Sequence, residues 1–188
     1  MKKQHVYSFA QGDGKDKKLL GGKGANLCEM NQIGINVPPG FVITTEACLD
    51  YLHKEKLPDG LMASIKDEIG KLEVQTGRTF GSGSDPLLVS VRSGSAMSMP
   101  GMMDTVLNLG LNDQSVEGLA QESGNPRFAW DSYRRFIQMF GNVVMNISKD
   151  AFEYRLDALK SALGVSEDTE IDVPGWKALV QEFKQVVI

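Results

Sequence analysis

The hydrophobic pattern of the first forty residues predicts two short strands on either side of a helix. His5–Phe9 alternates aromatic and β-branched residues with polar ones, and Phe41–Ile43 is a short apolar run after a rigid Pro-Pro-Gly turn, so both are predicted strands. Between them, apolar residues recur at helical spacing up to Gly34, a common C-terminal stop. This helix is predicted to begin near residues 22–24, with Lys23 at its N-terminal edge.

Two further helices are predicted before residue 77. Thr44 or Thr45 can cap the first, because a hydroxyl oxygen can accept from the amides of the first turn. Asp59 is the predicted cap of the second, which carries one apolar face and ends at Gly77.

The central stretch from Leu87 to Asn112 predicts two strands joined by a long connection. Leu87–Val91 is apolar apart from one serine, which is typical of a strand covered on both faces. Val106–Leu111 resumes a strand pattern, and the methionines and small residues between them follow neither a strand nor a helix period. The connection is longer than an ordinary hairpin loop, which has about two to five residues. It is therefore either a loop that covers a ligand or an overlong hairpin connection.

After this stretch the pattern becomes helical. Helix starts are predicted at Asn112 or Asp113, at Asn125, at Ser148 and at Pro174. The change predicts an α/β lobe at residues 1–111 and a helical subdomain at residues 112–188.

Composition removes several classes of function. The hydrophobic fraction of 41% is ordinary for a globular protein, and the net charge of −4 gives no general attraction to nucleic acid or to anionic membranes. No apolar run approaches the about 20 residues of a membrane span, and the first residues do not form a secretory signal. Cys28 and Cys48 are predicted to be reduced, buried thiols, which suits a cytoplasmic protein.

Two cations carry the candidate chemistry. Lys23 opposes the helix dipole where it stands, which makes sense if an anion lies between the lysine and the helix amides. The alternative is a solvated lysine beside glycines that only make a turn. Arg92 follows the central strand directly, at the mouth of the long connection, where a cation and open backbone N–H groups would suit a polyphosphate. Asp104 is more readily explained as a structural residue than as a metal ligand, because it is a single carboxylate.

Other residues are more ambiguous. Arg127, Arg134 and Arg135 could form a cationic face that docks a phosphate or a partner domain, or they could pair with acids nearby. Trp130 and Trp176 are predicted core anchors.

Four segments together resemble the N-terminal part of the pyruvate, phosphate dikinase family. They read LLGGKGANLCEM, VPPGFVITTEAC, DPLLVSVRSGSAMSMPGMMDTVLNLGLN and GNPRFAWDSYRRFIQMF. The phosphoenolpyruvate synthase family looks similar at the lysine segment and at Val-Arg-Ser, but carries a different, more acidic loop afterwards. The Met-Pro-Gly-Met-Met-Asp-Thr run therefore favours the dikinases.

The resemblance implies an α+β fold: an ATP-grasp N-terminal lobe, with a small mixed sheet and helices, followed by a small helical subdomain. It implies a phosphotransferase that binds ATP with Mg²⁺ and phosphorylates a histidine on another domain of the same full-length chain. That phosphohistidine converts pyruvate to phosphoenolpyruvate, with AMP and diphosphate as the other products and phosphate consumed. The magnesium ligands are expected outside this sequence, which alone would be inactive. The full-length enzyme is expected to be a cytoplasmic homo-oligomer, with neither nucleic acid nor membrane as a partner.

By position, the resemblance assigns triphosphate binding and catalysis to Lys23 and Arg92. The expected loop over the phosphates contains Ser93, Gly94, Ser95, Ala96, Met97, Ser98, Met99, Gly101, Met103, Asp104 and Thr105. Two alternatives remain: a synthase-like ATP lobe, and a non-enzymatic module whose Met-rich loop binds an apolar partner.

Overall fold

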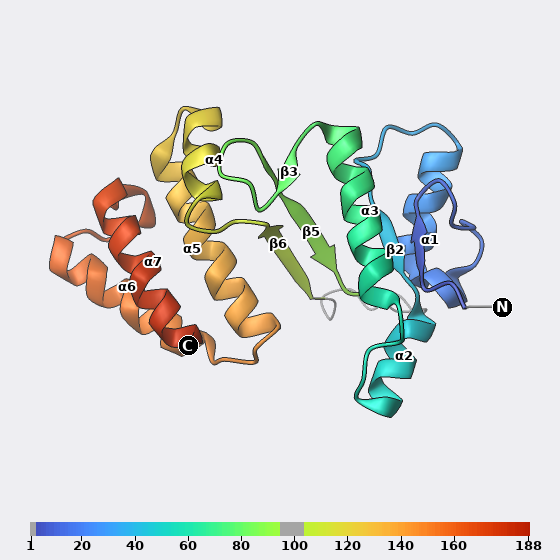
Figure 1. The fold of residues 1–188 in the computed structure, drawn as a ribbon. Coiled ribbons are helices and arrows are strands. Elements are labelled where there is room, and N and C mark those ends of the chain that lie inside the picture. The colour runs from blue at the N-terminus through green and yellow to red at the C-terminus, as the bar shows by residue number, and fades with distance from the viewer. Residues whose placement is uncertain (1–2, 95–103) are drawn as a thin grey trace. The chain divides into compact units, whose positions relative to one another are not determined.

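The computed structural model describes residues 3–94 and 104–188, which form two compact units (Figure 1). The first unit contains residues 3–77 together with Ser93 and Gly94, and the second contains residues 78–92 and 104–188. Helices and small sheets occur in the chain together, so the predicted α+β class is confirmed. The domain division at residues 111 and 112 stays a prediction.

The first unit is built around one pair of strands. β1 (Val6–Ser8) and β2 (Phe41–Ile43) pair antiparallel. The three helices of the unit are α1 (Lys17–Gln32), α2 (Thr45–Lys54) and α3 (Leu61–Thr76). Its apolar core falls into two small clusters, whose buried members are Val6, Ala47 and Leu61 in one and Leu20, Ala25 and Cys28 in the other.

Several local predictions in this unit are confirmed and two are wrong. Thr44 caps α2 by accepting a hydrogen bond from the Ala47 amide at 3.2 Å. Asp59 does not cap α3, because Gly60 occupies the cap position without a side-chain hydrogen bond. Cys28 is buried as predicted, but Cys48 is exposed on α2.

The strands of the second unit lie at its start. β3 (Thr79–Phe80) pairs parallel with β4 (Pro86–Leu87), and β5 (Val89–Arg92) pairs antiparallel with β6 (Thr105–Leu109). Among the described residues the strands therefore form three separate two-stranded sheets, instead of the single mixed sheet that was expected.

The predicted strand at Leu87–Val91 needs correction. It is divided between β4 and β5, and only the β4 part is buried. Val91 is 49% exposed, so β5 is not covered on both faces. An uninterrupted apolar run could not reveal this, because the number of neighbouring strands depends on tertiary pairing.

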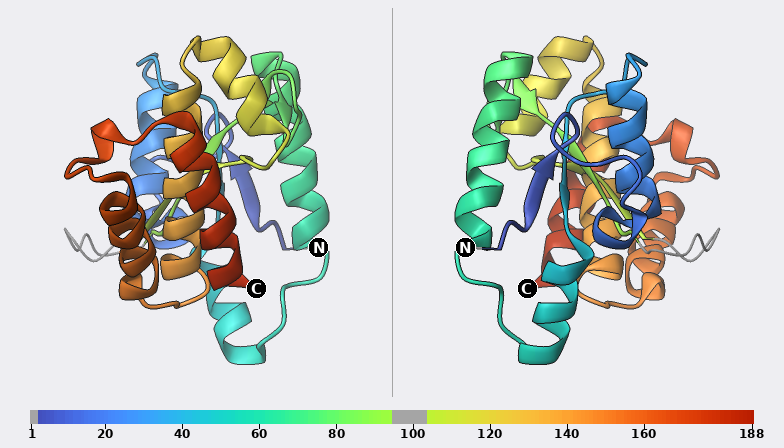
Figure 2. Two further views of the ribbon diagram at one scale, coloured as in Figure 1. Left: turned by 90° about the vertical axis from the view of Figure 1, so that its left-hand side faces the viewer. Right: turned by 90° about the vertical axis from the view of Figure 1, so that its right-hand side faces the viewer.

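Four helices follow the strands of the second unit. They are α4 (Ser115–Ser123), α5 (Pro126–Val143), α6 (Lys149–Leu163) and α7 (Val173–Val187), with a 3₁₀ turn, η1 (Asp168–Glu170), before α7. Asn125 and Ser148 cap α5 and α6 as predicted, each accepting from a first-turn amide. α5 packs against α4, α7 and β6, and the two views in Figure 2 show α5 beside α7. None of the described helices is long and apolar enough to cross a membrane.

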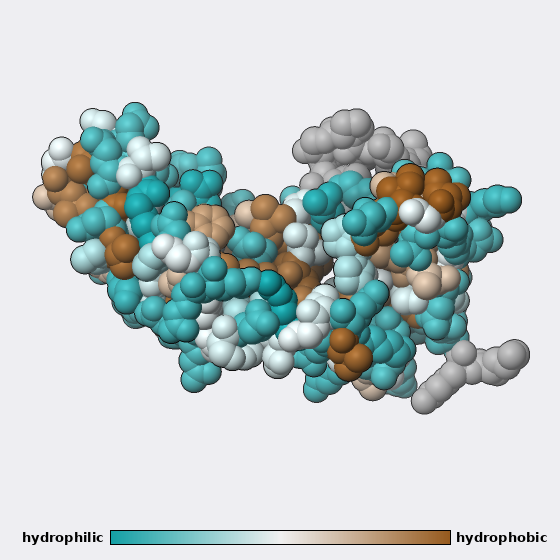
Figure 3. Space-filling model, turned by 90° about the horizontal axis from the view of Figure 1, so that it is seen from above, coloured by the Kyte–Doolittle hydropathy of each residue, from teal (hydrophilic) through white to brown (hydrophobic). Residues whose placement is uncertain are grey.

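The helices of the second unit enclose the larger apolar core. Trp176, Phe152 and Phe183 are fully buried, and Trp130 is nearly so, which confirms both tryptophans as core anchors. Seen from above, the surface is mostly hydrophilic, with hydrophobic residues gathered in small patches (Figure 3). Small exposed hydrophobic patches of this kind are ordinary for a folded protein.

Candidate functional site

Lys23 lies on α1 directly after a break in the helix. α1 begins at Lys17, capped by Asp16, and Gly21 interrupts it with φ 68° and ψ 162°. A left-handed φ of this kind favours glycine. The predicted start near residues 22–24 is thus the start of the second helical segment, and the preceding turn was missed.

The break changes the hydrogen bonding of the residues around Lys23. In an α-helix the amide of residue i bonds to the carbonyl of residue i−4, and the dihedral angles of the three residues between them must be helical. Gly21 lies between the two ends of three such pairs, whose amides belong to Gly22, Lys23 and Gly24. The break therefore disturbs the bonding of these amides, and the first N–H groups of a helical segment are the ones that can lack a partner within the helix.

The Lys23 segment is held against β2 by close packing. A Cβ on Gly24 would lie 2.8 Å from Cγ1 of Val42, so only glycine fits at this contact. Lys23 itself is half-buried, and its ammonium group has no ion pair among the described residues. A cation beside the amides of a helix break is the combination that binds phosphate oxygens.

The second part of the candidate site is the end of the β5–β6 hairpin. The register pairs Arg92, the last residue of β5, with Thr105, the first residue of β6, so β5 brings Arg92 to the mouth of the connection. Arg92 is exposed, and no described residue pairs with its guanidinium group. Ser93, Gly94 and Asp104 flank the mouth and are exposed, and Ser93 and Asp104 each take part in an interaction. Among the described residues, the hairpin therefore presents a guanidinium without a partner at its open end.

A one-residue irregularity shapes this hairpin. Val89 faces Leu109 whereas Val91 faces Val106, so β6 carries an extra residue between the two pairs. Asn108 accommodates it in the left-handed region, at φ 58°. Bulges of this type increase local twist and redirect the side chains beyond them.

The predicted site residues thus fall into two groups. Lys23 and Arg92 belong to different units, and each is described within its own. The remaining predicted loop residues lie outside the described part of the chain; they are Ser95, Ala96, Met97, Ser98, Met99, Gly101 and Met103.

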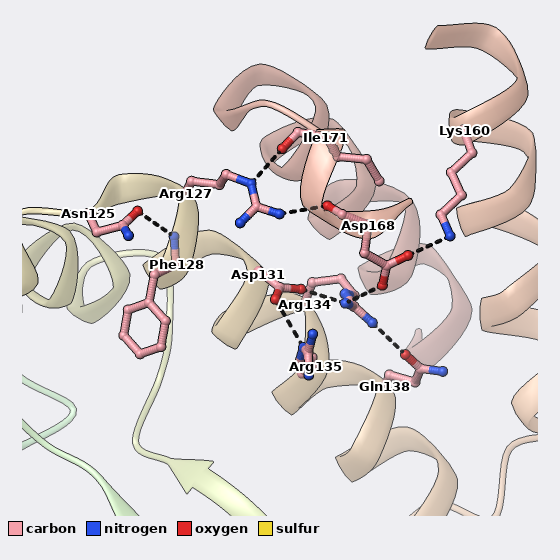
Figure 4. A network of polar contacts seen from close by, with 10 residues as sticks. All are labelled: Asn125, Arg127, Phe128, Asp131, Arg134, Arg135, Gln138, Lys160, Asp168 and Ile171. Atoms are coloured by element: carbon pink, nitrogen blue, oxygen red, sulfur yellow. Dashed lines mark hydrogen bonds and ion pairs between the residues drawn. The ribbon is translucent and has the colours of Figure 1, made fainter. Parts of the chain in front are cut away.

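The three arginines of α5 have structural partners (Figure 4). Arg127 donates to the backbone carbonyls of Ile171 and Asp168, at 3.0 and 2.7 Å. Arg134 is buried, and its Nη2 lies 2.5 Å from Oδ1 of Asp131 and 3.4 Å from Oδ2 of Asp168. Arg134 and Arg135 thus pair with nearby acids, whereas Arg127 is held by backbone carbonyls.

Asp168 is the acid that sequence reasoning missed. It lies in η1, and Lys160 of α6 donates to it at 2.5 Å. Burial by itself would raise the pKa of Asp168, but the hydrogen bond from Lys160 and the charges of Lys160, Arg134 and Arg135 outweigh it and hold the pKa below the usual value. Asp168 stands in an acidic segment that the sequence pattern indicated only as a linker, and nothing in that pattern singled it out.

The described residues offer no other candidate. They contain no group of three His, Cys, Asp or Glu side chains arranged to hold a metal ion. A surface hollow of about 400 Å³ lies along α3, and one of about 440 Å³ lies between α6 and α7. Neither is lined by a predicted site residue.

Comparison with known proteins decides between the candidate families. The family model "Pyruvate phosphate dikinase, AMP/ATP-binding domain" matches residues 17–73, which include Lys23 and its helix. Pyruvate, phosphate dikinase from Entamoeba histolytica is 52% identical over 181 residues, covering 96% of this chain and 20% of the relative. Along nearly its whole length, the chain matches part of pyruvate, phosphate dikinases.

Relatives from distant organisms agree. The enzyme of Rhizobium meliloti is 51% identical over 187 residues, covering 97% of this chain and 21% of its own length. The chloroplastic enzyme of Mesembryanthemum crystallinum is 53% identical over 190 residues, covering 98% and 20% respectively. The chain spans about a fifth of the length of the curated relatives it matches. The family model that matches residues 17–73 describes an AMP/ATP-binding domain.

Proposed function

We propose that this chain is the ATP-binding N-terminal part of a pyruvate, phosphate dikinase. The observation that carries the proposal is the family match over residues 17–73, a segment that contains Lys23 and the helix break at Gly21. In the proposed reaction, ATP, pyruvate and phosphate give AMP, phosphoenolpyruvate and diphosphate through a phosphohistidine on another domain of the full-length chain.

In this proposal Lys23 and Arg92 bind phosphate oxygens of ATP and neutralise the charge that develops during transfer. Phosphoryl transfer depends mainly on positioning and on electrostatic stabilisation, so fixed cations are sufficient catalytic groups. The segment from Ser93 to Thr105 would cover the phosphates, since its small residues permit close approach of backbone N–H groups.

Several finer features belong to the same proposal. The fold would be the N-terminal lobe of an ATP-grasp domain, with an α/β lobe at residues 1–111 and a helical subdomain at residues 112–188. Mg²⁺ would arrive with ATP, held by ligands outside the described residues. The full-length enzyme would be a homo-oligomer, and we infer a cytoplasmic location, although some relatives are named as chloroplastic.

The test is substitution of the two cations in the full-length enzyme. Lys23→Ala and Arg92→Ala should each weaken ATP binding at least tenfold, because a hydrogen bond to a charged group contributes about 1.5–3 kcal/mol. Both should abolish transfer of a labelled phosphoryl group from ATP to histidine. Lys66→Ala is the matched control, since Lys66 is exposed on α3 in the same unit as Lys23 and has no ion pair among the described residues. Normal histidine phosphorylation in both site variants would refute the assignment.

Product analysis separates the dikinase from the synthase-like alternative. A dikinase releases diphosphate from ATP and phosphate, whereas a water-using synthase releases inorganic phosphate. Inorganic phosphate as the sole second product would overturn the proposed reaction while leaving the nucleotide site intact.

A further inference from the structure

The hydroxyl of Thr45 links α2 to the broken part of α1. Thr45 Oγ1 lies 2.6 Å from the carbonyl oxygen of Lys18 and 3.2 Å from that of Leu19. Both contacts lie within the first unit, and they join residues more than twenty positions apart in the chain. Thr45 is therefore a tertiary contact of α1 and not only part of its own helix.

The two carbonyls that Thr45 contacts are those that the break at Gly21 affects. In a continuous helix, the carbonyl of Lys18 would accept from the Gly22 amide and that of Leu19 from the Lys23 amide. Because Gly21 is not helical, the break weakens both of these bonds, and a carbonyl that loses its partner costs free energy unless another donor replaces it. The Thr45 hydroxyl supplies one donor, which lies closer to the Lys18 carbonyl and is shared with that of Leu19.

Thr44 and Thr45 divide two tasks between adjacent hydroxyl groups. Thr44 is almost fully buried and caps its own helix through the Ala47 amide. The Thr45 side chain is not needed for capping, so its hydroxyl is available to α1. Sequence reasoning left the cap open between these two residues, and the structure gives each a separate role.

We propose that Thr45 is a positioning residue for the phosphate-binding segment at residues 22–24. By donating to the carbonyls of Lys18 and Leu19, it stabilises the broken form of α1, in which the amides of Gly22 and Lys23 stay available to phosphate oxygens. Without the hydroxyl, the two carbonyls compete for these amides and draw the segment toward a continuous helix. The inference rests on the proposed function, in which Lys23 binds ATP.

The test compares ligands with and without phosphate in the full-length enzyme. Thr45→Val removes the hydroxyl and keeps the shape, and it should raise the dissociation constant for ATP about tenfold. The dissociation constant for adenosine, which has no phosphate, should change less than twofold when measured by competition. Thr45→Ser, which restores the hydroxyl, should return ATP binding to within about threefold of the wild-type value.

Two further variants make the result independent of folding effects. Thr45→Ala also removes the hydroxyl and is measured in parallel, so the result does not depend on one variant folding. Thr76→Val is the matched control, because Thr76 Oγ1 donates to the Leu72 carbonyl at 2.7 Å in α3 of the same unit. This control should leave the affinity for ATP unchanged.

The outcomes separate this inference from the proposed function. Unchanged ATP affinity in Thr45→Val and Thr45→Ala, or an equal loss for ATP and adenosine, overturns the positioning role. If Lys23→Ala still weakens ATP binding in that case, the proposed function stands without it. If Lys23→Ala has no effect on ATP binding, the proposed role of Lys23 fails, and this inference fails with it.

Discussion

Burial should decide how much Arg134 and Arg135 contribute to stability, because both arginines bind the same acid. Asp131 accepts from Arg134 at 2.5 Å and from Arg135 at 3.0 Å. The Arg134 side chain is 6% exposed and the Arg135 side chain 59% exposed. The chain thus contains two ion pairs that share an acid and a helix but differ in exposure.

The difference in environment predicts a difference in energy. Arg134 also donates to Gln138 at 3.1 Å and lies 4.8 Å from the ring centre of Trp176, so its loss removes several buried contacts. Removing one partner of a buried pair costs about 3–5 kcal/mol, and we expect about 2–4 kcal/mol for Arg134→Met because Asp131 keeps Arg135. Arg135→Met should cost about 0–1 kcal/mol, as is usual for an exposed pair.

Tryptophan fluorescence during urea unfolding measures both variants. The two tryptophans of this sequence, Trp130 and Trp176, both lie in the core of the second unit, so in this chain their emission reports on the unit that contains the substitutions. Equal free energies of unfolding for Arg134→Met and Arg135→Met would refute the argument from burial. A stabilising effect of Arg134→Met would refute it as well.

Three other predictions follow from individual contacts. Gly24→Ala should destabilise the first unit by about 1–3 kcal/mol, because the new Cβ would approach a β2 side chain to 2.8 Å. Gly70→Ala on α3, where a Cβ meets open space, should stabilise the unit by about 0.5–1 kcal/mol, and thermal unfolding compares the two variants. Cys48 is exposed whereas burial raises the pKa of Cys28, so a thiol reagent should modify Cys48 in the native protein and Cys28 only after unfolding. Burial, and then the carboxylate of Asp113, raise the pKa of Tyr133. Its contribution to stability is therefore present below a pH of about 10 and is lost as the pH rises further. Ultraviolet absorbance of the phenolate should show that Tyr133 ionises only on unfolding.

Helix boundaries were predictable from sequence because local chemistry sets them. Asn125 and Ser148 each accept a hydrogen bond from a first-turn amide, an interaction that needs no distant partner. Gly124 and Gly164 end their helices in the left-handed conformation for an equally local reason. The failure at Asp59 is instructive, since its neighbour Gly60 adopts a left-handed φ of 82° and takes the cap position instead.

Tertiary features were less accessible. The exposure of β5 depends on how many strands lie beside it, and an apolar run such as Leu87–Val91 is equally compatible with one neighbour or two. The break in α1 had a visible sign in the Gly21-Gly22 pair, but the sequence could not show that a turn of helix precedes it. The hydroxyl of Thr45 had no sign at all, because its partners are backbone carbonyls in a distant segment.

The cations show most clearly what the structure adds to the sequence. The sequence alone does not separate Lys23 and Arg92 from Arg127 and Arg134 as candidate anion-binding residues. Lys23 and Arg92 stand at the ends of predicted elements, and the two arginines stand on a predicted helix face. In the structure the two α5 arginines are occupied by carbonyls or carboxylates, and such cations stabilise a fold. Lys23 and Arg92 have no such partner among the described residues, so their charge is available to an external anion.

Availability alone does not make a phosphate site, and Lys66 shows why. It is exposed and has no ion pair among the described residues, yet it lies on the continuous helix α3, where no break releases amides beside it. Lys23 differs from it in the break at Gly21, which adds backbone donors to the charge. If Lys23→Ala weakens ATP binding and Lys66→Ala does not, the broken helix accounts for the difference; equal effects would reduce both lysines to a general attraction between charges.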